Sequence, residues 1–223
     1  MLGGKNMSKV ISLEKLKDIF KDDMTIMISG FLGCGTGEKL IDTLIESDVK
    51  NLTIIGNDTS FIDRGIGRLI VNNQVKKVIA SHIGTNAQTG NLMNEGKLEV
   101  ELSPQGTLIE RIRAGGFGLG GVLTPTGVGT LVEENKEKIS INNKEYLLEY
   151  PLRADVALVK GSIVDEFGNT VYKGTTKNFN PMMAMASDIV IMEAEEFVNT
   201  GEINKEMIMT PGVVVDYIIK EAN

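Results

Sequence analysis

Short apolar runs alternate with amphipathic segments along most of the chain, a pattern typical of α/β proteins. The apolar runs predict strands at residues 25–28, 52–55, 75–80, 98–102, 154–160 and 188–193. Amphipathic spacing predicts helices at residues 13–20, capped by Ser12, and at residues 38–46 and 105–113. Because strand–helix–strand units pair their strands in parallel through a right-handed crossover, we expect one open, mainly parallel sheet with helices on both faces.

Other segments depart from this alternation. Residues 139–148 are predicted to form a small antiparallel hairpin, because Asn142 and Asn143 tolerate the positive φ of a tight turn. Gly168 and Asn169 indicate a second hairpin turn, and residues 213–220 fit either a final strand or a helix. The run at residues 98–102 alternates apolar and acidic side chains, which favours an edge strand or one beneath a polar cleft. Glycine is too frequent in residues 114–121 for the preceding helix to continue, so we expect a long flexible loop through Thr130.

Length and charge limit the possible functions. A chain of 223 residues is expected to form one domain, over residues 7–223, with residues 1–6 an added or disordered extension before a start at Met7. No apolar run is long enough to cross a bilayer and the start lacks the apolar core of a secretory signal, so we expect a cytoplasmic protein. A net charge of −7 without a basic run argues against nucleic acid or a membrane surface as partner.

A ligand loop is predicted where the strand at residues 25–28 ends. It runs into Ser-Gly-Phe-Leu-Gly-Cys-Gly at residues 29–35, which opens the next helix and is expected to present bare backbone N–H groups to an anion. The same arrangement also occurs at corners that bind nothing. Ligands of open parallel sheets gather at the carboxyl ends of the strands, so we expect the loops at residues 29–36, 103–107 and 115–130 to meet on one rim.

The only cysteine and the only histidine add little chemistry. A single cysteine excludes an intramolecular disulfide and a cysteine-based metal cluster, and Cys34 is interpreted as a small packing residue. His82 follows a strand toward the expected rim, where we interpret it as a hydrogen-bonded structural histidine. We predict no metal site.

Several motifs together resemble the α subunit of the family I CoA-transferases. They span residues 22–35, 99–116 (Glu-Val-Glu-Leu-Ser-Pro-Gln-Gly-Thr-Leu-Ile-Glu-Arg-Ile-Arg-Ala-Gly-Gly), 124–130, 152–160, 173–181 and 210–213. Within that family the pattern is most similar to the clostridial acetoacetyl-CoA:acetate/butyrate type. The resemblance covers the chain from about Met7 onward.

The resemblance implies the reaction. CoA passes from acetoacetyl-CoA, or another short acyl-CoA, to a carboxylate such as acetate or butyrate. A glutamate attacks the thioester carbonyl and forms a mixed anhydride. CoA thiolate then attacks the anhydride and leaves a glutamyl-CoA thioester. The incoming acid reverses these two steps. It implies no permanently bound cofactor and no metal, with coenzyme A as substrate.

The resemblance also implies a divided active site. The family's glutamate lies in a Ser-Glu-Asn-Gly motif that this sequence lacks, so we expect it on a separate β subunit, in a heterotetramer of two α and two β subunits. We interpret Glu99, Glu101, Glu110 and Glu166 as surface or ion-paired carboxylates rather than nucleophiles.

The resemblance identifies two groups of site residues. Gln105, in Ser-Pro-Gln-Gly-Thr, matches the family glutamine whose amide forms part of the oxyanion hole. The CoA-binding candidates are Ser29, Gly30, Phe31, Leu32, Gly33, Cys34 and Gly35. The sequence departs from the family's pattern at Ser29 and Asp23, where glycines are usual, and at Thr36-Gly37.

Some interpretations stay open at this point. Residues 115–121, with Phe117, are either a mobile wall that excludes water from the anhydride or a surface loop. A non-catalytic phosphometabolite-binding or regulatory protein on the same fold is the alternative function. A dinucleotide-binding dehydrogenase is disfavoured, because the glycines of residues 30–35 have the wrong spacing.

Overall fold

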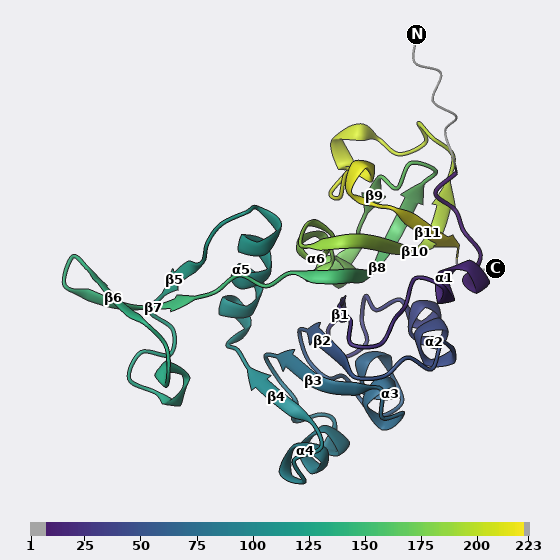
Figure 1. The fold of residues 1–223 in the computed structure, drawn as a ribbon. Coiled ribbons are helices and arrows are strands. Elements are labelled where there is room, and N and C mark those ends of the chain that lie inside the picture. Colours follow the sequence, from purple (N-terminus) through teal and green to yellow (C-terminus); the bar gives the residue numbers. More distant parts are fainter. Residues whose placement is uncertain (1–7, 221–223) are drawn as a thin grey trace.

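The computed structural model describes residues 8–220, which form one large sheet with helices on both of its faces and a separate three-stranded arm (Figure 1). The predicted extension at residues 1–6 lies outside the described residues. The eight-stranded sheet has the order β11-β10-β8-β1-β2-β3-β4, and β9 pairs with β8. Its strands are β1 (Thr25–Ile28), β2 (Leu52–Gly56), β3 (Val75–Ala80), β4 (Glu99–Leu102), β8 (Ala154–Asp165), β9 (Thr170–Val171), β10 (Ser187–Val198) and β11 (Tyr217–Lys220).

All neighbouring strands of the main path pair in parallel, and only the β8–β9 pair is antiparallel. The mainly parallel sheet predicted from the sequence is therefore confirmed, including the edge position of β4 and the turn at Gly168. Residues 213–220 resolve into a short 3-10 helix, Gly212–Val214, followed by strand β11.

The helices cover the sheet on opposite faces, and alternate residues of β1 show this. Ile26 and Ile28 belong to one apolar core and Met27 to the other. Side chains of α1 (Leu13–Lys17), α2 (Glu38–Glu46) and α3 (Gly65–Val71) fill the first core, and those of α5 (Gln105–Gly116) and α6 (Asn180–Met185) fill the second. Sequence reasoning missed α3, α6 and α4 (Ala87–Asn94), the last of which begins at the Asn86 cap.

Helix α5 continues past its predicted end at residue 113. The glycines expected to stop it serve close packing instead: a Cβ on Gly115 would overlap the carbonyl of Leu152, and one on Gly116 would stand 2.9 Å from Met185 atoms. Packing against neighbouring backbone therefore outweighs the low helix propensity of glycine here.

The arm is a sheet of β5 (Val122–Thr124), β7 (Lys144–Glu149) and β6 (Lys138–Ile141), which projects from the main body beside α5 (Figure 1). The predicted hairpin at residues 139–148 is confirmed, with φ of 50° at Asn142 and 60° at Asn143. The prediction of one long loop over residues 115–130 is wrong, because β5 lies inside it and pairs with β7.

No helix in residues 8–220 combines the length and apolar character needed to span a membrane.

Candidate functional site

The loop that follows β1 contains a tight turn at residues 31–34, which we call the rim turn. Phe31 and Cys34 exchange backbone hydrogen bonds of 3.0 and 2.9 Å. The two central residues, Leu32 and Gly33, have φ of 51° and 84°. Positive φ at both central positions suits glycine and asparagine, whereas leucine adopts it at a cost.

Most amides of the loop already have partners inside the protein, so the expectation of a row of bare N–H groups is wrong. Among the described residues 29–36, those of Gly33 and Gly35 donate no hydrogen bond. The N-terminus of α2 is also occupied, because Oε2 of Glu193 accepts from the amides of Lys39 (3.0 Å) and Leu40 (3.2 Å). This buried carboxylate of β10 takes the place that a bound anion takes at other helix N-termini.

Two asparagines at the start of α6, Asn178 just before it and Asn180 as its first residue, hold one side of the loop. Asn178 accepts from the Gly30 amide (3.3 Å) and donates to the Cys34 carbonyl (3.1 Å), and Asn180 donates to the Gly35 carbonyl (3.1 Å). Both lie in the motif at residues 173–181 that carries the family resemblance, but sequence reasoning gave them no role. Their contacts link segments about 145 positions apart in the chain, which local patterns do not encode.

Asp58 holds the other side of the loop, from the end of β2. One carboxylate oxygen accepts from the Leu32 amide (3.0 Å) and the other from the Ser60 amide (2.6 Å). The side chain is buried, and burial raises the pKa of this carboxyl group, although the two amide hydrogen bonds oppose the shift. His82 pairs with Asp58 through a backbone bridge and lies at the rim as predicted.

Gln105 lies at the start of α5, just after β4, and is exposed. Its Nε2 donates to Oδ1 of Asn57 (2.9 Å), which also accepts from Oγ of Ser81 (3.0 Å). Asn57 and Asp58 are adjacent, so one short segment after β2 contacts both the rim turn and Gln105. The structure thus brings the loops at residues 29–36 and 103–107 to one rim, as predicted.

The loop at residues 115–130, which was also expected at this rim, does not lie there. Helix α5 has 12 residues, about 18 Å at 1.5 Å per residue, and carries the chain back to the amino ends of the strands. There Arg153, directly before β8, donates to the carbonyl of Gly115 (3.0 Å). Residues 115–121 and Phe117 therefore begin at the opposite end of the sheet and do not form a wall of this site.

The remaining predicted residues have mixed outcomes. Glu99, Glu101 and Glu110 are ion-paired as expected, and Glu166 accepts from Thr200. Cys34 is not a packing residue, since it is exposed on the outside of the rim turn, with Sγ 3.1 Å from Oγ1 of Thr175. The His82 side chain makes no hydrogen bond to any described residue, contrary to the structural role expected of it.

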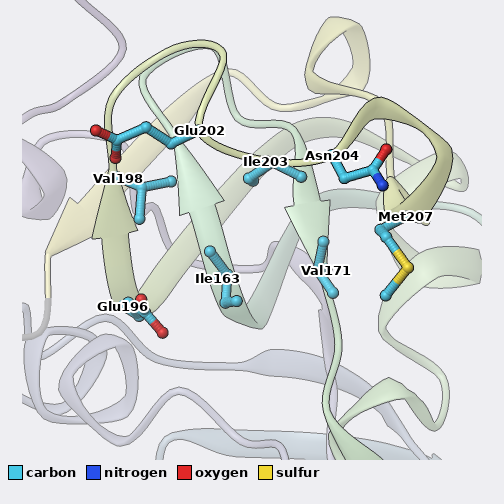
Figure 2. Close-up of a pocket in the computed structure, with 8 residues that line it drawn as sticks. All are labelled: Ile163, Val171, Glu196, Val198, Glu202, Ile203, Asn204 and Met207. Carbon is cyan, nitrogen blue, oxygen red and sulfur yellow. The ribbon is translucent and has the colours of Figure 1, made fainter.

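A cavity of about 200 Å³ lies elsewhere, between β8, β9, β10 and the segment that follows β10. Figure 2 shows that its walls are mainly aliphatic, and its lining residues are Ile163, Val171, Glu196, Val198, Glu202, Ile203, Asn204 and Met207. Its two carboxylates already bind Lys173 and Asn199. None of the predicted site residues lines it.

Comparisons with known proteins agree on one family. The family model described as coenzyme A transferase matches residues 11–221. The acetoacetyl-CoA:acetate/butyrate CoA transferase alpha subunit of Clostridium acetobutylicum is 66% identical over 96% of this chain and 98% of that protein. The acetate CoA-transferase subunit alpha of Escherichia coli K12 is 54% identical over 95% and 96%.

Solved structures show the same fold at low identity. Glutaconate coenzyme A-transferase from Acidaminococcus fermentans superposes with a TM-score of 0.85 at 18% identity, over 96% of this chain and 75% of that one. An acyl-CoA transferase from Escherichia coli O157:H7 superposes with a TM-score of 0.84 at 21% identity, over 98% of this chain. The present chain spans about half of that protein, 48% of its length.

Proposed function

This chain belongs to the coenzyme A transferase family as an α subunit, and from that premise we propose that it serves transfer of CoA from acetoacetyl-CoA, or another short acyl-CoA, to acetate, butyrate or a similar carboxylate. The observation that carries the proposal is the 66% identity to a relative named for these substrates, over nearly the whole of both chains. We keep the cytoplasm as the expected compartment. A non-catalytic binding protein on the same fold is not favoured.

The proposed nucleophile is a glutamate of a β subunit. Its carboxylate attacks the thioester carbonyl and releases CoA thiolate, which then attacks the glutamyl carbonyl of the mixed anhydride and releases the first acid. The incoming carboxylate reverses the two steps, so no net proton or electron is needed. A β partner is supported by the α designation of both close relatives and by the absence of Ser-Glu-Asn-Gly here. We propose two α and two β subunits.

Gln105 is proposed to donate to the oxyanion that forms when the thioester carbonyl is attacked. A primary amide carries two N–H donors, and Asn57 occupies one of them at 2.9 Å. That hydrogen bond fixes which end of the amide is the donor end and leaves the second N–H for the substrate. A donor oriented before the reaction starts needs no reorganisation when the charge develops.

Residues 29–35 are proposed to receive the CoA thioester next to that donor. Because hydrogen bonds within the protein use most amides of the loop, the contribution of its backbone is limited to Gly33 and Gly35. We therefore propose a shaped surface for the thioester end of CoA rather than a phosphate-binding helix N-terminus. Glu193 already fills the latter position.

The proposal is tested with purified α chain, purified β partner and the reconstituted complex. Exchange between acetoacetyl-CoA and acetate is followed by the loss of acetoacetyl-CoA, with acetyl-CoA as product. We expect no exchange from either chain alone and turnover from the complex. Appreciable exchange by the lone α chain would contradict the division of the site, and a complex that forms but does not exchange would contradict the proposed reaction.

A further inference from the structure

We propose that Asp58 is a positioning residue for acyl-CoA, which holds the rim turn in the shape that receives the thioester. The inference deepens the proposed function and rests on it. Asp58 does not itself contact the reacting atoms in this account. It acts through the backbone of the loop.

The two hydrogen bonds of Asp58 go to two unusual backbone positions. Its carboxylate accepts from Leu32, where φ is 51°, and from Ser60, where φ is 53°. A residue with a Cβ is disfavoured in this left-handed region. One side chain therefore holds two non-glycine residues, on two loops, in a conformation that neither prefers.

The chemistry of the side chain matches that task. A carboxylate offers two acceptor oxygens, so it can serve both amides at once. An asparagine of the same shape offers one acceptor and would turn an NH₂ group toward the second amide. The exchange Asp58→Asn therefore breaks one of the two anchors while it keeps the volume of the side chain.

Burial makes a purely stabilising role a poor explanation. Asp58 is 3% exposed, and among residues 8–220 the charge that acts on its pKa is that of His82, which lowers it less than burial raises it. A buried carboxylate without a lysine or arginine partner is expensive in free energy, and burial is the largest influence on the pKa of this group, which it raises. A carboxylate kept at this position despite that cost points to a task that needs two acceptor oxygens, and holding both amides is such a task.

The position of Asp58 also connects the loop to the proposed oxyanion donor. Asn57, its neighbour in the chain, accepts from Gln105. A displacement of this segment therefore moves the rim turn and the Gln105 amide relative to each other. Misplacement of about 1 Å in a substrate-holding group is enough to reduce rates substantially.

The experiment compares Asp58→Asn with a matched control in the complex with the β subunit. The control is Asp165→Asn, because Asp165 is equally buried at 3% and also uses both oxygens as acceptors but has no hydrogen bond to the loop. Its Oδ1 accepts from the amides of Phe167 and Asn169, and its Oδ2 accepts from the side chain of Asn169. Initial rates are measured with acetoacetyl-CoA and acetate varied separately. Thermal unfolding of each complex is recorded in parallel.

We expect Asp58→Asn to raise KM for acetoacetyl-CoA about tenfold, the equivalent of one lost charged hydrogen bond, with KM for acetate changed less than twofold. Asp165→Asn is expected to lower the melting temperature and leave both KM values within twofold. Equal KM effects from the two variants would overturn the proposal, since they would indicate general loosening. An unchanged KM in Asp58→Asn would overturn it as well.

A second variant tests the backbone strain directly. Asparagine tolerates positive φ better than leucine, so Leu32→Asn in the Asp58→Asn background removes part of the need for the anchor. We expect the KM of this double variant for acetoacetyl-CoA to be at least threefold lower than that of Asp58→Asn alone. No recovery would contradict the role of Asp58 in holding Leu32. The wild-type complex is measured in the same assay. A wild-type complex without exchange activity would contradict the proposed function, whereas an active wild-type complex with no rescue in the double variant would contradict only the role of Asp58.

Discussion

The rim turn and the turn of the arm hairpin both have positive φ at their two central residues but are held in different ways. Leu32 and Gly33 have φ of 51° and 84°, and Asn142 and Asn143 have φ of 50° and 60°. Asparagine favours this conformation by itself, because its short polar side chain bonds to nearby backbone. The rim turn has a leucine at its first central position and depends on Asp58 and Asn178, which come from distant parts of the chain.

Under the proposed function, the difference separates a structural turn from one that serves binding. The arm turn only has to reverse the chain, so local propensity is sufficient. The rim turn must also occupy a fixed position relative to Gln105 and the loop after β2, which local propensity cannot provide. Contacts across the fold supply that position, and they permit side chains that would be unfavourable in a free hairpin.

The largest effect expected from this comparison belongs to the rim. Gln105→Ala removes the donor proposed for the oxyanion, and we expect kcat of the complex to fall about 10²–10³-fold, as for other oxyanion donors. The melting temperature is expected to stay within about 2 °C, because Gln105 is exposed. Steady-state rates and thermal unfolding of the complex measure the two quantities.

The matched control for that change is Gln88→Ala. Gln88 also lies in the first turn of a helix, α4, but outside the rim loops. We expect kcat within twofold of wild type for this variant. A similar loss of activity in both variants, or none in Gln105→Ala, would remove Gln105 from the mechanism.

The sequence predicted the regular parts of the molecule and missed those that depend on contacts across the fold. Apolar periodicity located β1 and α2 with the observed bounds, because burial in a parallel sheet imposes it directly. It missed α3 and α6, short helices whose Gly-, Pro- and Met-containing sequences have little amphipathic contrast. It also ended β10 at residue 193, whereas the strand continues to Val198 with exposed residues after Ala194.

The candidate site shows the same limit. The strand–glycine–helix pattern identified the loop at residues 29–35 as a ligand loop, the family resemblance assigned it to CoA and identified Gln105, and the structure brings the two loops to one rim. Asn57, Asp58 and Asn178 carried no local signal, because each acts by a hydrogen bond to a segment that lies 26 or more positions away. The loop at residues 115–130 was placed on the wrong end of the sheet, since the full length of α5 was not anticipated.

The next effect in size tests whether the arm turn is held locally. Asn142→Leu puts a leucine into positive φ without tertiary support, and we expect a cost of about 1 kcal/mol in the stability of the arm. Backbone amides of β7 should then exchange with solvent about fivefold faster, since 1.4 kcal/mol is a factor of ten. Hydrogen exchange read by mass spectrometry over residues 138–149 measures it.

The control for the arm is Asn142→Gly, which keeps a residue suited to positive φ and is expected to change exchange less than twofold. Both arm variants should keep KM for acetoacetyl-CoA within twofold in the complex. If Asn142→Leu raised that KM as strongly as Asp58→Asn, the arm would belong to the binding site and the comparison of the two turns would fail.

The smallest effect is expected where the rim turn is given the residue type of the arm turn. Leu32→Asn in the wild-type chain relieves backbone strain but loses some buried apolar surface, so we expect a net gain of at most about 0.5 kcal/mol, or about 1–2 °C in melting temperature. Leu32→Ala loses the same apolar side chain without the short polar group and is expected to lower the melting temperature. Differential scanning calorimetry of the two complexes measures the difference. If both variants lowered the melting temperature equally, positive φ at Leu32 would carry no strain that Asp58 has to offset. The rim turn would then need no more support from distant residues than the arm turn does.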